Sequence, residues 1–228
     1  MAQVLRVVIR LFQAGGIVMI PLLIFSIVVF ALTIERIRFW FTVTRDQRSV
    51  TREFLQLYRT DPELAFDELK QHTHLPLPRI FLEALELENA SLGQFRLALE
   101  GATQAEIPIL KRFNTIFQTV VAVAPLLGLL GTILGLIRSF SSIKIGQIGA
   151  NATNVTGGIS EALVSTAAGM VVAIATLVVT NIFRGLYRRQ IAMFREYASQ
   201  LEILYEWHVY AKNGGSQPME ESYASMGR

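Results

Sequence analysis

The chain has 228 residues, of which 52% are apolar and only 17% are charged. Soluble domains carry about a quarter charged residues, so this balance disfavours an ordinary soluble domain. Leu, Ile, Val and Phe are abundant and glycine has no period, which excludes a disordered or collagen-like chain. No cysteine is present, which excludes disulfides, thiolate zinc sites, iron–sulfur clusters and cysteine nucleophiles. The net charge of +3 is small, so the distribution of charge along the chain is more informative.

Residues 1–13 are predicted to form an amphipathic helix that lies in the outer interface of a membrane. Gln3, Arg6, Arg10 and Gln13 recur at intervals of three and four, which places them on one narrow face of a helix. The positions between them are mostly apolar.

Three uncharged stretches, 17–34, 119–137 and 162–183, are long enough to cross a bilayer. About 20 mostly apolar residues in a helix span the hydrocarbon layer. A buried helix of a soluble protein would seldom run so far without a charge, so we predict three transmembrane helices. The first stretch is longer than the apolar part of a signal peptide, and no small-x-small cleavage site precedes Glu35, so we expect it to be retained.

The distribution of Lys and Arg predicts the orientation. Segment 36–113 holds eleven of them and segment 184–228 holds six, whereas the loop 138–160 and the N-terminal piece hold two each. Basic residues accumulate on the cytoplasmic side of membrane proteins. We therefore expect 36–113 and the C-terminus in the cytoplasm, with 138–160 as a short outer loop and the N-terminus outside.

The cytoplasmic segments are predicted to be helical. Thr60-Asp61-Pro62-Glu63 has the pattern of a helix N-cap with proline in the first turn, and the helix is expected to reach Gln71. The sequence His-Leu-Pro-Leu-Pro at 74–78 predicts a break, followed by a helix over 79–88. His72 and His74 lie in this loop without a third ligand nearby in sequence, so we expect no metal site.

Two of the transmembrane helices are expected to extend far into the cytoplasm. Ser91 is a candidate cap, and no strong stop follows it, so one helix of roughly 45 residues is predicted up to Ile137, with bends at Gly101 and Pro108. The third span is expected to continue over 184–212. Residues 213–228 are polar and small, and we expect a disordered tail.

Glu161 is the only acidic residue between Ile107 and Arg195, and it lies at the outer end of the third span. A carboxylate at this depth usually faces a polar interior or a pathway. It is equally compatible with a solvated first turn, where the helix dipole favours an acid. These two interpretations remain open on the sequence alone.

The third span has one polar face. At about 100° per residue its polar positions fall within an arc of about 140°, and they are Glu161, Ser165, Thr166, Thr176 and Thr180. Gly169 lies between them, and bulky residues occupy the opposite side. We predict that this face lines a proton pathway or pore. Threonine in a membrane helix often bonds only the carbonyl four residues back, so packing alone is the alternative explanation for these hydroxyls.

The second span has a matching face of small residues, among them Gly128, Thr132 and Gly135, with Gly131 beside them. The spacing Gly131-x-x-x-Gly135 favours close helix packing, which accounts for the glycines. It accounts less well for the threonines, so we predict that Thr132 and Thr166 line a hydrated or proton-accessible interior.

No Asp, Glu, His or Lys lies within the three predicted spans. Hydroxyls can relay protons or position water, but they hold no charge at neutral pH. A proton pathway here would therefore need a titratable group from another chain, or Glu161 acting from the edge.

Residues 124–135 (APLLGLLGTILG) and 159–169 (ISEALVSTAAG) resemble the second- and third-span signatures of the TolQ/ExbB/MotA proton-channel family. The resemblance is close over about 120–183. Three spans rather than four favour the TolQ/ExbB branch over the flagellar MotA branch. One departure is Ala173-Ile174-Ala175, where many members have proline after Ala-Ile, so the curvature of this helix is expected to differ.

The resemblance implies an all-α inner-membrane motor subunit that forms a homo-oligomeric ring, a pentamer in this family, around a central pore. Its implied partner is a single-span protein of the ExbD/TolR type, whose Asp carries protons and couples the proton-motive force to mechanical work. Thr132 and Thr166 match the pore threonines of the family, and Glu161 matches its acid. We expect no enzyme activity, cofactor, metal or nucleic-acid partner. A stand-alone channel or transporter, and a structural membrane scaffold, are the alternatives.

Overall fold

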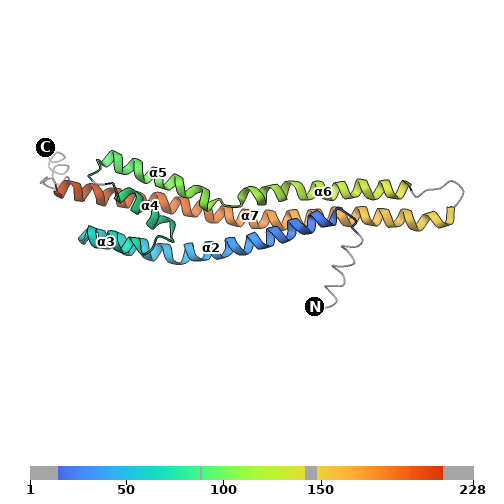
Figure 1. Cartoon of the computed structure of the whole chain (residues 1–228), viewed down its shortest axis with the longest axis horizontal. Coiled ribbons are helices and arrows are strands. Elements are labelled where there is room, and N and C mark those ends of the chain that lie inside the picture. Colours follow the sequence, from blue (N-terminus) through green and yellow to red (C-terminus); the bar gives the residue numbers. More distant parts are fainter. Residues whose placement is uncertain (1–14, 88, 142–147, 213–228) are drawn as a thin grey trace, which may run out of the picture. The chain divides into compact units, whose positions relative to one another are not determined.

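The computed structural model describes residues 15–87, 89–141 and 148–212, with the side chains of 148–155 excepted (Figure 1). The described residues form helices and no strand, which confirms the predicted all-α class. The helices are α2 (Met19–Thr60), α3 (Pro62–Lys70), α4 (Pro76–Leu85), α5 (Leu92–Leu110), α6 (Asn114–Ser141) and α7 (Ile148–Lys212). The predicted helix over 1–13 and the predicted tail over 213–228 lie outside the described residues.

The chain divides into two compact units. The first, here called the apolar unit, contains Met1–Ile37 and Arg112–Gly185; the second, the polar unit, contains Arg38–Lys111 and Leu186–Arg228. Each boundary falls beside a basic residue that the charge pattern assigns to the end of a membrane span.

Three described helices, α2, α6 and α7, are long and apolar enough to cross a membrane, as predicted. Their most apolar windows have mean hydropathies of 2.1, 2.5 and 2.3, yet only 17%, 28% and 28% of these windows is buried within the chain. A small core joins them, centred on Val18, Leu22, Phe117, Val120 and Ala124. Most of the apolar surface therefore faces outward, as expected of helices whose solvent is lipid or another membrane protein.

The predicted single helix from Ser91 to Ile137 is wrong. The chain turns between α5 and α6, where Phe113 has a left-handed backbone with φ +66°. Pro108, two residues before the end of α5, removes a backbone donor and weakens the last helical turn. The guanidinium groups of Arg36 and Arg112 lie 5.8 and 4.7 Å from the centre of the Phe113 ring and hold the turn.

The helices that run far beyond their apolar windows are α2 and α7. The prediction for α7 is confirmed up to Lys212, whereas α2 continues through Glu35 to Thr60 because no proline or glycine interrupts that stretch. The expected outer loop 138–160 is also helical at both ends, since α6 reaches Ser141 and α7 begins at Ile148.

The short helices of the polar unit begin at local capping signals. Asp61 caps α3 by accepting a hydrogen bond from the Leu64 amide at 3.0 Å, as its sequence predicts. Ser91 and Gln94 form a capping box at the start of α5. The helix expected over 79–88 begins earlier, at Pro76, because proline fits the first helical turn, and it ends at Leu85.

Candidate functional site

In the apolar unit, α6 and α7 make a close contact through glycines. A Cβ added at Gly169 would lie 2.5 Å from the carbonyl oxygen of Ala124, and one at Gly135 would lie 2.7 Å from that of Gly158. A Cβ on Gly128 or Gly131 would meet the Ser165–Thr166 turn of α7. The two backbones are in direct contact, which requires glycine at these positions.

This close approach brings Thr132 of α6 and Thr166 of α7 together. Their hydroxyl groups form a hydrogen bond across the helix interface. Thr166 Oγ1 also lies 3.0 Å from the Gly128 carbonyl oxygen, and Thr132 Oγ1 lies 3.2 Å from the same oxygen and 3.4 Å from that of Ala162. Both threonines are half-buried, so the pair retains some exposure on the surface of the chain.

The threonine pair accommodates two hydrogen-bond directions. Each hydroxyl has one proton and can also accept. Thr132 can donate to Thr166 while Thr166 donates to Gly128, or Thr166 can donate to Thr132 while Thr132 donates to a carbonyl. The heavy atoms need not move between these arrangements. The pair can therefore switch between these two donor–acceptor arrangements, which allows it to relay a proton or to orient a water molecule. Neither hydroxyl carries a charge.

The other predicted hydroxyls lie inside the chain. The exposed fractions of Ser165, Thr176 and Thr180 are 0%, 0% and 3%. Ser165 donates to the Ala162 carbonyl at 2.9 Å, and Thr176 and Thr180 each donate at 2.7 Å to the carbonyl four residues back. These bonds satisfy the hydroxyls locally. A pathway that reached them would have to run between helices of one chain.

Glu161 lies at the far end of the α6–α7 contact, with 19% of its side chain exposed. Its Oε1 is 2.5 Å from Nη1 of Arg138, near the end of α6. The carboxylate also lies against Gly16, which has φ +70° and where a Cβ would overlap it. Glu161 thus joins three chain segments. Sequence alone did not identify Arg138 as the partner of Glu161, although Arg138 follows the second span just as Glu161 precedes the third.

Ionisable side chains occur only toward the ends of the described apolar unit. Glu35, Arg36, Arg112 and Arg184 lie at one end of its helices, and the Arg138–Glu161 pair lies at the other. The Thr132–Thr166 pair lies between these ends. Within the described residues no group of three His, Cys, Asp or Glu side chains is arranged to hold a metal ion.

Three apolar helices, with small and hydroxylated residues where two of them meet, define a multi-pass membrane protein. The model of the MotA/TolQ/ExbB proton channel family matches residues 72–196, which is more than half of the chain. This chain belongs to that family, and the matched segment includes both threonines and Glu161.

Similar proteins carry names from the same family. A putative biopolymer transport protein ExbB-like 3 of Synechocystis is 56% identical over 93% of this chain and 99% of its own length. The Synechocystis protein ExbB-like 1 is 39% identical over 85% of this chain and 77% of its own length. The biopolymer transport protein ExbB of Xanthomonas campestris is 39% identical over 46% of this chain and 41% of its own length.

Proposed function

We propose that this chain is the channel-forming subunit of a proton-driven motor in the bacterial inner membrane. The Thr132–Thr166 pair is the observation that carries this proposal. It places two hydroxyls at a tight helix contact, away from the ionisable ends of the apolar unit. Family membership supports proton conduction and energy transduction as the general role.

The proton carrier is a carboxylate supplied by a second protein. This follows from the chemistry of the described apolar unit, where hydroxyls alone lie between the two charged ends. An ExbD/TolR-type partner with a single span and an Asp fits this requirement. Several copies of the chain, five by family resemblance, surround that span, so that Thr132 and Thr166 of each copy face it.

The exposed apolar surfaces of α6 and α7 support assembly into such a ring. Leu129, Ile133 and Ile137 on α6, and Val171, Ile174 and Val178 on α7, are all at least half exposed in the single chain. In the proposed membrane orientation, the polar unit and the C-terminus lie in the cytoplasm. Arg138 and Glu161 then lie at the outer mouth of the pore. Each proton that crosses 100 mV releases about 2.3 kcal/mol, which the complex converts into movement against its partner.

The test is proton flux into vesicles under an imposed membrane potential. The chain is co-expressed with a single-span, Asp-bearing protein of the ExbD/TolR type and reconstituted as a complex. Thr132→Val and Thr166→Val are expected to lower flux by about tenfold or more, which corresponds to ~1.4 kcal/mol in the barrier. Valine keeps the shape of threonine and removes the hydroxyl.

Thr119→Val is the matched control. Thr119 is an exposed residue of the same helix, and its hydroxyl donates only to the Thr115 carbonyl, at 2.9 Å. The Thr119→Val complex should conduct protons like the wild type. Equal flux in all three variants would favour a scaffold whose hydroxyls only pack. Full flux from vesicles that contain this chain alone would favour a stand-alone channel.

A further inference from the structure

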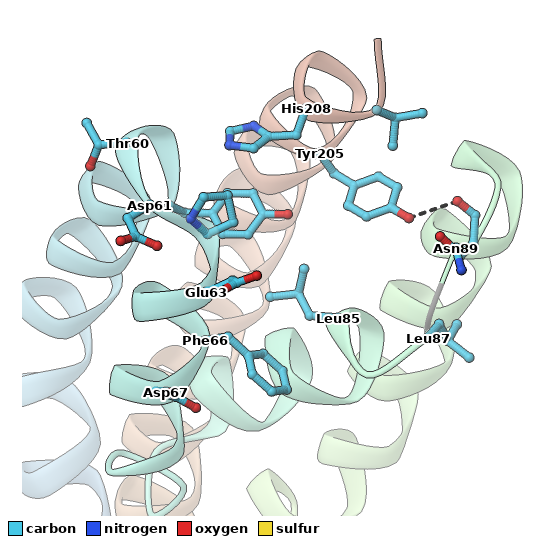
Figure 2. Close-up of a pocket in the computed structure, with 14 residues that line it drawn as sticks. Thr60, Asp61, Glu63, Phe66, Asp67, Leu85, Leu87, Asn89, Tyr205 and His208 are labelled. Carbon is cyan, nitrogen blue, oxygen red and sulfur yellow. Dashed lines mark hydrogen bonds between the residues drawn. The ribbon is translucent and has the colours of Figure 1, made fainter. Parts of the chain in front are cut away.

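A cavity of about 1080 Å³ lies within the polar unit, and neither threonine of the Thr132–Thr166 pair lines it. Its walls come from the end of α2, the start of α3, the end of α4 and the last turns of α7 (Figure 2). Cavities that bind small molecules have volumes of about 300–1,000 Å³, so this one has room for an extended ligand or a short peptide segment.

The charged residues that line the cavity are all acidic. They are Asp61, Glu63 and Asp67, and no Lys or Arg of the described residues lines it. Asp61 accepts the Leu64 amide, and Asp67 pairs with Lys70 at 2.8 Å. Glu63 has no hydrogen bond or ion pair among the described residues, and Figure 2 shows its carboxylate pointing into the cavity. Asp61 and Glu63 therefore have no cation paired with them among the described residues, and the Glu63 carboxylate faces this space.

Tyr58 adds a second, independent feature. It lines the cavity and is only 5% exposed, yet its hydroxyl has no hydrogen-bond partner within the described parts of the chain. The neighbouring Tyr205, in contrast, donates to the Ala90 carbonyl at 2.8 Å. The ring is largely buried, but the hydroxyl oxygen is not one of the fully buried polar atoms without a partner, so it keeps access to solvent and is available to a ligand.

The remaining polar and aromatic groups also suit a cation. His208 Nδ1 lies 3.0 Å from the Leu204 carbonyl oxygen and must donate to it, so Nε2 of the neutral ring is an acceptor. Phe66 already binds a cation on its ring, because Lys70 Nζ lies 4.4 Å from the ring centre. Leu85 and Leu87 provide apolar wall for an alkyl chain.

We propose that this cavity binds an organic cation that carries an ammonium or guanidinium group. The charged group lies between the Glu63 carboxylate and the Tyr58 hydroxyl, and its alkyl chain lies along Phe66 and the leucines. A bare metal ion is a poorer match, since no cluster of three metal-ligating side chains occurs among the described residues. This site is separate from the proposed proton pathway and does not depend on it.

Calorimetric titration of the full chain in detergent tests the proposal, with spermidine and an arginine-containing peptide as separate probes. Saturable binding of either supports the site, and which of them binds tells whether the cation is a free polyamine or part of a protein. Glu63→Gln should weaken the binding by about fivefold, because one partly exposed charge pair is lost. Tyr58→Phe should weaken it by about threefold, because one hydrogen bond is lost.

Glu83→Gln is the matched control. Glu83 is an exposed acid on α4 that does not line the cavity. The Glu83→Gln substitution removes the same charge as Glu63→Gln and should leave the binding affinity within about twofold of wild type. Lack of saturable binding of both probes overturns the proposal. An equal loss in Glu63→Gln and Glu83→Gln also overturns it, because the attraction would then come from net charge rather than from the cavity.

Discussion

Arg138 Nη1 lies 2.5 Å from Glu161 Oε1, and the two side chains differ greatly in exposure. The Arg138 side chain is 54% exposed, whereas that of Glu161 is 19% exposed and packs against Gly16. The pair connects the end of α6 with the third apolar helix. Its carboxylate is the less solvated partner and depends more on the contact.

This asymmetry predicts unequal effects of removing each partner. Arg138→Gln leaves the Glu161 carboxylate poorly solvated and unpaired, and should lower the free energy of unfolding by about 1–2 kcal/mol. Glu161→Gln leaves an arginine that still reaches solvent, and should cost less than about 1 kcal/mol. Thermal unfolding in detergent measures both. If Glu161→Gln were the more damaging of the two, the carboxylate would have a hydrogen-bond partner other than Arg138.

The contact at Gly169 predicts a large effect from one methyl group. Gly169→Ala would place a Cβ 2.5 Å from the Ala124 carbonyl oxygen and 3.1 Å from the Gly128 Cα. Because both neighbours are backbone atoms, α6 and α7 must separate, at a cost of about 1–3 kcal/mol. Thermal unfolding measures this cost, and proton flux should fall with it as the threonine pair separates.

Gly185→Ala on the same helix is the control. Nothing lies within 4 Å of a Cβ at Gly185. Alanine is the better helix former, so this variant should be neutral or more stable by up to ~1 kcal/mol. Similar losses in both variants would show that glycine matters on α7 for flexibility rather than for the contact.

Tyr58 predicts a loss of stability at alkaline pH. Burial, with a smaller contribution from Tyr205, raises the pKa of Tyr58 to about 12. Between about pH 10 and 12 the folded chain keeps the proton that the unfolded chain releases. The contribution of Tyr58 to the free energy of unfolding should therefore be fully present below pH 10. Above pH 10 the free energy of unfolding should fall by up to ~1.4 kcal/mol per pH unit.

Denaturant unfolding at several alkaline pH values measures that slope. Tyr58→Phe has no hydroxyl to ionise at this position and should flatten the slope, with a remainder from Tyr205, whose pKa burial also raises. Tyr210→Phe removes the hydroxyl of an exposed ring and serves as the control. An unchanged slope in Tyr58→Phe would mean that Tyr58 is solvated in the folded protein.

Gln47 predicts a stabilising substitution in the polar unit. It is fully buried, its Oε1 accepts no hydrogen bond, and its Nε2 meets only Met193 Sδ, at 3.8 Å. Gln47→Leu should raise the free energy of unfolding by about 1 kcal/mol, because an unpaired buried acceptor is removed. Gln56→Leu, on an exposed position of the same helix, should have little effect. Destabilisation by Gln47→Leu would indicate that a water molecule or another chain satisfies the amide.

Local patterns were sufficient for the three apolar helices and for the start of α3. The three uncharged runs, the cap at Asp61 and the motifs around Thr132 and Thr166 each lie within a few consecutive turns. Hydropathy, capping and glycine spacing act over that range, so these features could be inferred without coordinates.

The remaining features depend on which helix faces meet. The left-handed turn at Phe113 is held by Arg36, far away in the chain, and the helical periodicity of α5 and α6 gave no sign of it. Thr176 and Thr180 share the polar face of Thr166, but packing buries them. The ion pair of Glu161 with Arg138 depends on the contact between α6 and α7. Tyr58 and Glu63 face a common cavity because α3, α4 and α7 converge there. Residue type and spacing specify what a helix can present, whereas contacts between distant segments determine what it does present.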